Sequence, residues 1–326
     1  MTKFQRIIIS AGPINYLIEK SKVWELPGFQ GLCLYDVVAF FGTRIKEVGL
    51  SERAAAISFN LLMAIPAATI FLCTLIPYMP VSKLITRELL LLTRDITPNL
   101  NTYLLVKDFL VDFLDTPREG LLSLGFLLVM FTSSNAMIGV MRSFNRSLMH
   151  STRRNFFQKR WVALKLTLIL MFLIIATVLL LVTQGAALKW ILKAMHMHRT
   201  DAWTMFLIKF IRFIIIVALF FYGISFMYKY APAVKNKHKL NTPGSILATF
   251  LTVLLTLAFS YWVNKFGNYN KIYGSIGTII ILMVLIFLNS LVLLIGYELN
   301  VSIQSLKIIA SNRKHEHEQE LVTTKK

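Results

Sequence analysis

Six long apolar segments constrain the fold of this chain more than any other feature of its sequence. The clearest two, residues 54–76 and 121–141, contain no charged side chain. A helix needs about 20 apolar residues to cross the roughly 30 Å hydrocarbon core of a bilayer, whereas helices of soluble proteins keep a polar face for water. The pattern therefore predicts an all-α membrane protein, a bundle of six spans at residues 54–76, 121–141, 161–183, 204–228, 245–263 and 276–297.

Composition favours a membrane protein and argues against a nucleic-acid-binding one. Hydrophobic residues make up 56% of the chain and charged residues 16%, against about 45–50% and about 25% in soluble proteins. The net charge of +19 would also suit a protein that binds nucleic acid. The basic residues, however, stand in short connectors between apolar segments, where they set membrane orientation. We therefore expect the lipid bilayer as partner and no nucleic acid.

The distribution of Lys and Arg predicts which side of the membrane each connector faces. Residues 1–53, 142–160, 229–242 and 299–326 together hold 22 of them, and the connectors on the opposite side hold ten. Basic residues are retained on the cytoplasmic side, so both termini are predicted to be cytoplasmic. This orientation requires an even number of spans, which favours keeping the fourth segment although it contains Lys209 and Arg212.

The chain divides into a membrane domain and two cytoplasmic ends. Residues 1–53 form the N-terminal segment, in which 36–48 is predicted to be an interfacial helix because apolar and charged residues recur at helical spacing. Residues 54–298 form the six-span domain, in which the connector 77–120 is predicted to form external amphipathic helices. Residues 299–326 form a tail that is predicted to be partly disordered, because it is polar and dense in charge.

Polar side chains inside the spans are the first candidates for a binding site, because they are costly in hydrocarbon. In the second span Asn135, Arg142 and Asn145 share one helix face. They either line a polar path or serve structure, with Asn135 bonding across helices and Arg142 extending to anionic headgroups. The first span holds Asn60 and Pro66, where a loosened helix either builds a substrate site or simply bends.

Two further pairs stand near the ends of spans. Lys209 and Arg212 are three residues apart in the fourth span. They either attract a phosphate or lipid headgroup inside the bundle or stay at the interface, if the helix begins near Phe213. Tyr269 and Tyr273 belong to a short connector rich in Asn and Gly, which either dips into the bundle or turns outside it at the level of the headgroups.

Glu298 and Asn300 directly follow the last span. A carboxylate near the C-terminal end of a helix is unfavourable with the helix dipole. Glu298 is therefore predicted to have a cationic partner, which the sequence alone does not identify.

No pattern typical of an enzyme is present. The histidine pairs in HMH and HEH lack the partners that metallohydrolase spacing requires. The sequence has no Gly-rich phosphate loop with its Lys and no nucleophile elbow. Cys33 and Cys73 are too few for a metal cluster. We therefore predict a protein that is not an enzyme, with no cofactor and no bound metal.

Three segments carry a resemblance to a known family. SERAAAISFNLLMAIPAATIF, from Ser51, and GLLSLGFLLVMFTSSNAMIGVMRSFNRSL, from Gly120, resemble the first two spans of the YihY/BrkB family, bacterial inner-membrane proteins once labelled ribonuclease BN. The segment from Phe266 has an N-Y-x-x-x-Y-G-S-x-G turn and a closing G-x-E-L-N. The matching positions are Tyr269, Tyr273, Gly274, Ser275, Gly277, Gly296, Glu298, Leu299 and Asn300. The chain departs from the family pattern at Phe59, where a Tyr is usual nearby, and at Ile286, where a Trp is usual nearby.

The resemblance implies a six-span helical bundle of the bacterial inner membrane, linked to envelope integrity and to lipid or small-molecule transport. We expect a transporter or flippase-like protein for an anionic lipid or small solute. The alternative is a non-transporting envelope-integrity protein that binds a lipid or protein partner; RNA cleavage is the least favoured activity. The candidate substrate-binding residues are Asn60, Asn135, Arg142, Lys209, Arg212, Tyr269, Tyr273, Glu298 and Asn300.

Overall fold

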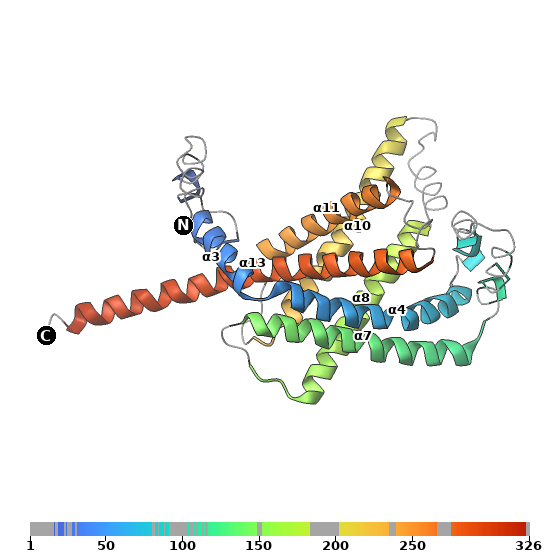
Figure 1. Ribbon diagram of the computed structural model, residues 1–326, viewed down its shortest axis with the longest axis horizontal. Coiled ribbons are helices and arrows are strands. Elements are labelled where there is room, and N and C mark those ends of the chain that lie inside the picture. The colour runs from blue at the N-terminus through green and yellow to red at the C-terminus, as the bar shows by residue number, and fades with distance from the viewer. Residues whose placement is uncertain are drawn as a thin grey trace. The chain divides into compact units, whose positions relative to one another are not determined.

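The computed structural model describes residues 31–79, 117–148, 152–182, 202–234, 239–265 and 275–323, and single residues or short runs within 16–29 and 82–114. Every element with defined bounds is a helix (Figure 1). The elements are α3 Leu34–Glu47, α4 Leu50–Leu75, η1 Ile76–Tyr78, α7 Glu119–Ser147, α8 Phe156–Val182, α10 Ala202–Tyr230, α11 Pro243–Lys265 and α13 Ser275–Thr323.

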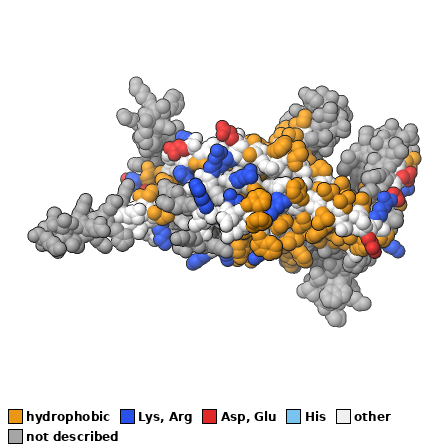
Figure 2. Space-filling model, turned by 90° about the horizontal axis from the view of Figure 1, so that it is seen from below, with side chains coloured by type: hydrophobic (Ala, Val, Ile, Leu, Met, Phe, Trp, Pro, Cys, Tyr) orange, Lys and Arg blue, Asp and Glu red, His pale blue; other side chains and the backbone are white. Residues whose placement is uncertain are grey.

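Six of these helices are long and apolar enough to cross a membrane, as the sequence predicts. The spans are Leu50–Tyr78, Glu119–Ser147, Phe156–Thr177, Phe213–Tyr230, Pro243–Trp262 and Ile280–Asn312. Large apolar side chains such as Phe131, Phe172 and Phe250 are exposed along them. Figure 2 shows how widely hydrophobic side chains cover the face in view. Such a surface suits contact with lipid rather than with water.

The chain forms two compact units. The first unit comprises Met1–Ala56, Arg142–Arg153 and Pro232–Lys326, and the second comprises Ile57–Met141 and Arg154–Ala231. Helices α4 and α7 each contribute to both units, because each passes from one to the other within its length.

In the first unit, α3 and α11 pack against the long helix α13 (Figure 1). Val37 of α3 lies in one apolar cluster with Leu299 and Ile303 of α13, and Leu247 of α11 packs on the same cluster. Gly49 adopts a positive φ of 62° between α3 and α4, a conformation that glycine enters without strain. This turn leads the chain directly from α3 into the first turns of α4.

In the second unit, glycines and small side chains bring α4 and α7 together. Ala67 and Phe71 of α4 share an apolar cluster with Val129 and Met130 of α7. A Cβ added to Gly125 would lie 3.4 Å from the Phe71 Cα, which shows how closely the two helices approach. Close approach through small residues is the usual way in which membrane helices gain packing contacts.

The connector between η1 and α7 is only partly described. Its described residues include helical ones, and Ile85 and Leu114 pack with Ile76 in an apolar cluster. That the connector 77–120 forms external amphipathic helices stays a prediction.

Several helices extend beyond the predicted spans, including α4 at its start and α13 at its end. Helix α4 begins at Leu50 rather than near 54, and it therefore includes Arg53. Helix α13 continues to Thr323, through the part of the tail that was expected to be partly disordered. A helix that is already formed adds residues without a new nucleation step, and the tail is rich in Lys, Glu and Gln, which are good helix formers.

Candidate functional site

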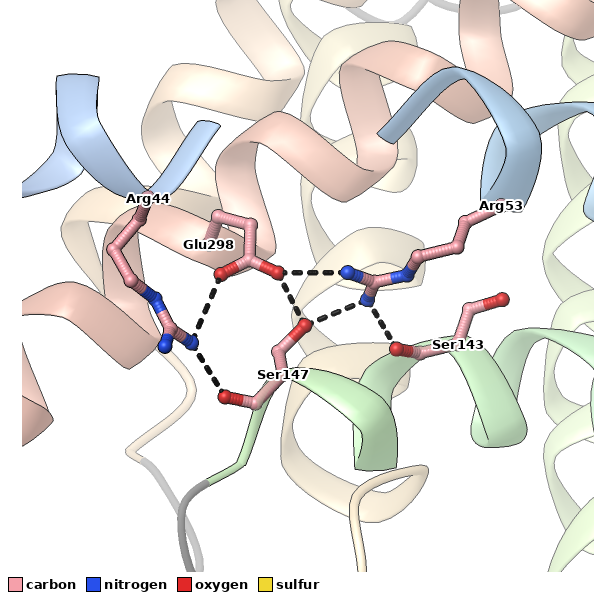
Figure 3. Close-up of polar contacts among 5 residues, drawn as sticks. All are labelled: Arg44, Arg53, Ser143, Ser147 and Glu298. Carbon is pink, nitrogen blue, oxygen red and sulfur yellow. Dashed lines mark hydrogen bonds and ion pairs between the residues drawn. The ribbon is translucent and has the colours of Figure 1, made fainter. Parts of the chain in front are cut away.

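The Glu298 cluster consists of Arg44, Arg53, Ser143, Ser147 and Glu298, and it lies within the first unit (Figure 3). The Arg53 Nη1 atom is 3.0 Å from the Glu298 Oε1 atom, and the Arg44 Nη2 atom is 3.6 Å from Oε2. The Glu298 side chain is 0% exposed and the Arg53 side chain 3%, whereas Arg44 is 17% exposed. The predicted cationic partner of Glu298 is thus confirmed, and there are two.

The arginines of this cluster also bind the end of α7. Arg53 donates through Nη2 to the Ser143 carbonyl oxygen and, at 2.6 Å, to the Ser147 Oγ atom. Arg44 donates to the Ser147 carbonyl oxygen at 2.6 Å. The last carbonyls of a helix have no partner within it, and positive charge is favourable at this end. The cluster therefore closes the C-terminal end of α7.

The Ser147 hydroxyl completes the cluster by donating to Glu298 Oε1. Four helices thus converge on one buried carboxylate: α3, α4, α7 and α13. Burying charges is costly, but these charges are paired and hydrogen-bonded, which offsets much of the cost. The carboxylate is enclosed by protein groups, so this arrangement is suited to holding the four helices together rather than to binding a ligand.

Asn300 connects a fifth helix, α11, to α13 through hydrogen bonds. Its side-chain oxygen accepts a hydrogen bond of 2.8 Å from the Gly244 backbone N–H, and its amide donates to the Thr242 Oγ1 atom at 2.9 Å. The Gly244 N–H is one of the first N–H groups of α11, which lack a partner within the helix. A Cβ at Gly244 would meet the Gly296 carbonyl oxygen and would lie 2.6 Å from the Asn300 Cγ. The two helices are therefore in backbone contact here.

The remaining residues of G-x-E-L-N also have structural partners. The Tyr297 ring stacks on the Phe144 ring with their centroids 4.0 Å apart. Leu299 belongs to the apolar cluster of the first unit. Every position of the motif thus contributes to joining α13 to its neighbours within this unit.

The candidates Asn60 and Asn135 lie in the second unit. The Asn135 side-chain oxygen accepts a hydrogen bond of 2.6 Å from Arg160 of α8, whose guanidinium lies 4.9 Å from the centre of the Phe131 ring. Asn60 is half-buried, and a Cβ on Gly139 would lie 3.1 Å from its Nδ2 atom. Both asparagines thus lie at contacts between helices.

The other candidates fall elsewhere. Arg142 belongs to the first unit and is exposed, which suits a side chain that extends to headgroups. Lys209 and Arg212 lie on α10, and their side chains are outside the described part of the structure. Tyr269 and Tyr273 lie outside the described residues altogether.

Sequence reasoning missed the roles of Arg44 and Arg53. Both were counted only as basic residues of the N-terminal stretch. One signal was available: Arg53 precedes an uncharged apolar segment by a single position, so any helix that begins slightly earlier has to accommodate its charge. Separately, no group of three or more His, Cys, Asp or Glu side chains that could hold a metal ion occurs among the described residues.

Comparison with known proteins supports the resemblance that the motifs suggest. Residues 41–321 match the family described as Virulence factor BrkB. The chain is 28% identical over 259 residues to YfkH of Bacillus subtilis (strain 168), a protein named as ribonuclease-like, and the alignment covers 78% of this chain and 90% of YfkH.

Shorter matches occur with UPF0761 membrane proteins. The identity is 36% over 87 residues for one from Pseudoalteromonas translucida (strain TAC 125) and 35% over 82 residues for one from Idiomarina loihiensis. Each match covers 25% of this chain and 29% of the relative. No solved structure matches. Because the family match extends over most of the chain and the fold has six helices able to cross a membrane, this protein belongs to the BrkB family of integral, multi-pass membrane proteins.

Proposed function

We propose that this chain is a protein of the bacterial inner membrane, with both termini in the cytoplasm, that supports envelope integrity by binding a lipid or a protein partner. Its polar interior then serves to hold the helices together rather than to conduct a solute. The distribution of basic residues between the connectors supports the orientation.

This proposal rests on the burial and the hydrogen bonding of Glu298 and Asn300. Both are buried, and both are bonded to other residues of the first unit. A residue that binds a transported anion or solute has to exchange protein partners for the substrate during each cycle. Breaking a buried ion pair of this kind leaves uncompensated charge and costs about 3–5 kcal/mol. That cost favours a fixed, structural role for the cluster.

Thiol accessibility tests this proposal. In a Cys33→Ser, Cys73→Ala background, single Cys residues replace Ser134 and Ser302, which are both 0% exposed and lie next to Asn135 and one turn after Glu298. A membrane-impermeant thiol reagent is then applied from each side in turn. We expect both positions to stay unlabelled. Labelling of either one would mean a water-filled path and would contradict the proposal.

Ser51→Cys provides the matched positive control, because Ser51 is exposed at the start of α4. It should react with reagent applied from the cytoplasmic side alone. Reaction from the opposite side alone would overturn the proposed orientation.

A transporter or flippase-like role for an anionic lipid or small solute is the second candidate. It is favoured by the Arg160–Asn135 hydrogen bond, because Asn135 lies roughly 18 Å along α7 from its last residue, Ser147. A charged side chain that reaches this far along a span is by default a candidate for function. In liposomes containing the purified chain, Arg160→Gln should abolish movement of fluorescent phosphatidylglycerol if this role holds, and Arg153→Gln, at an exposed residue, should not.

A further inference from the structure

Two lysines of the second unit contact one aromatic ring, and an arginine binds the backbone beside it. Lys165 of α8 places its Nζ atom 5.9 Å from the centre of the Tyr230 ring, and Lys229 of α10 places its Nζ atom 5.5 Å from the same point. Arg154 donates from Nη1 to the Ala231 carbonyl oxygen at 2.9 Å and from Nη2 to the Tyr230 carbonyl oxygen at 3.4 Å. These residues, Arg154, Lys165, Lys229 and Tyr230, are the Tyr230 cluster.

No carboxylate is available nearby in the sequence to balance this charge. Helices α8 and α10 contain no Asp or Glu, and neither does the stretch 142–160 or the stretch 229–242. Contact with the Tyr230 ring face provides only a modest attraction for the two ammonium groups. Both ammonium groups lie near one ring centre, at 5.9 and 5.5 Å, and like charges repel one another, so a bound anion would stabilise the arrangement.

Arg154 gives the Tyr230 cluster a fixed point. Its two hydrogen bonds to carbonyls at the C-terminal end of α10 hold the guanidinium in place, and this end of a helix favours positive charge. Burial lowers the pKa of the Arg154 guanidinium, because apolar surroundings disfavour its charged form. An anion next to the guanidinium would favour its charged form and would therefore oppose this lowering of the pKa.

An exposed apolar stripe runs along α8 through the same place. Phe157, Trp161 and Phe172 are 83%, 72% and 77% exposed, and Leu168 is exposed between them. With Lys165 they recur at intervals of three or four residues, so they share one face of the helix. Trp at the end of a span marks the level of the headgroups, and a Lys one turn farther along the helix can extend its ammonium group back to that level.

We propose that the Tyr230 cluster binds the phosphate of an anionic phospholipid headgroup, while the acyl chains of that lipid lie along the exposed stripe of α8. The stripe is the reason to assign a lipid rather than a soluble phosphate, because a soluble ion has no use for an exposed apolar surface. This inference rests on the proposed function in its lipid-binding form, and it names the ligand class and the residues.

The test measures lipid binding to the purified full chain in detergent, with phosphatidylglycerol as the anionic probe and phosphatidylcholine as the neutral one. Lys165→Gln and Lys229→Gln should each weaken phosphatidylglycerol binding about fivefold, since one basic residue near a membrane surface contributes about that much. The double variant should weaken it more than either single variant does, and phosphatidylcholine binding should not change.

Lys83→Gln is the matched control, because Lys83 is an exposed lysine in the connector before α7. It should bind phosphatidylglycerol as the unchanged protein does. The conservative pair Lys165→Arg with Lys229→Arg keeps both charges and should restore binding, which separates loss of the site from loss of the fold.

Two results would overturn the assignment of the site. The first is a double Gln variant that binds phosphatidylglycerol as tightly as the unchanged protein. The second is displacement of phosphatidylglycerol by millimolar glycerol phosphate, which would assign the cluster to a soluble phosphate. Binding of neither lipid by the unchanged protein would overturn the lipid-binding form of the proposed function itself. Labelling of Ser134→Cys or Ser302→Cys would instead contradict the non-transporting role, which the lipid-binding test does not address.

Discussion

The Glu298 cluster in the first unit and the Tyr230 cluster in the second use the same kind of residue in opposite ways. In the first, two arginines enclose one carboxylate and the end of a helix, and the central atoms are fully buried. In the second, basic residues gather with no acid in the adjoining helices, next to an exposed apolar stripe. The difference lies in a single acidic residue, Glu298.

This comparison explains how a strongly basic membrane protein can contain both fixed and available charges. An arginine that has a buried carboxylate partner is held in place, and moving it would leave the carboxylate unpaired. A lysine that contacts an aromatic ring, as Lys165 and Lys229 contact Tyr230, keeps its capacity to bind an anion. The first unit should therefore respond to substitutions through its stability, and the second through binding.

The largest effect on stability is expected from Glu298→Ala. The change leaves Arg53 and Arg44 facing each other without their carboxylate, and removing one partner of a buried pair costs about 3–5 kcal/mol. The free energy of unfolding can be measured in detergent micelles by denaturant titration. Glu119→Ala, at an exposed acid in the first turn of α7, should lose less than about 1 kcal/mol. Equal losses for the two variants would contradict the structural role of the Glu298 cluster.

The next largest effect is expected from Gly244→Ala, at about 3 kcal/mol. The added methyl group would meet the Gly296 carbonyl oxygen and the Asn300 side chain, so α11 would have to move away from α13. Gly120→Ala is a suitable control because nothing lies within 4 Å of its added Cβ. A shift in the melting temperature of the Gly244 variant alone is expected, and an unshifted Gly244 variant would mean that the two helices are not in backbone contact.

The sequence predicts the spans because their signal is local. Each span needs only an apolar stretch of sufficient length, and the requirement comes from the bilayer rather than from other parts of the chain. The cationic partner of Glu298 was predicted from the helix dipole, but that reason was wrong, because α13 continues to Thr323 and Glu298 lies far from its C-terminal end. The partner is required instead because the carboxylate is fully buried. Which residue it is was not predictable, because Arg53 is 245 residues away in the sequence and looks like any other basic residue near a span.

The candidate site residues show the same limit of reasoning from local sequence. Glu298 and Asn300 were chosen because polar groups near a span are costly, which is correct, but the cost is met here by partners within the protein. Nothing local indicates that Gly244 and Thr242 lie opposite Asn300. The extent of the tail helix was missed for another reason: charge density predicts disorder only where no formed helix leads into the segment.

Replacing Asn300 in the first unit and Asn135 in the second sharpens the comparison between the units. Asn300→Ala leaves the Gly244 N–H and the Thr242 hydroxyl without this partner in a buried place, which costs about 1–3 kcal/mol. Asn135→Ala removes one hydrogen bond from Arg160, which is only half-buried, and should cost about 1 kcal/mol. Thermal unfolding of both variants under one condition gives the ranking. The reverse order would place the more tightly packed polar contact in the second unit.

The smallest effect on stability is expected from Arg142→Gln. Arg142 lies one position before Ser143, yet it is exposed, whereas the Ser143 carbonyl accepts the Arg53 guanidinium within the Glu298 cluster. A surface substitution of this kind normally changes the free energy of unfolding by less than about 0.5 kcal/mol. The same variant reconstituted in liposomes should also leave lipid and solute movement unchanged, because we infer that the Arg142 side chain extends to the headgroups. If stability is unchanged but movement of an anionic probe falls tenfold or more, Arg142 belongs to a transport route. The first unit would then contain a ligand-binding charge as well, which would contradict the contrast between a structural first unit and a ligand-binding second unit.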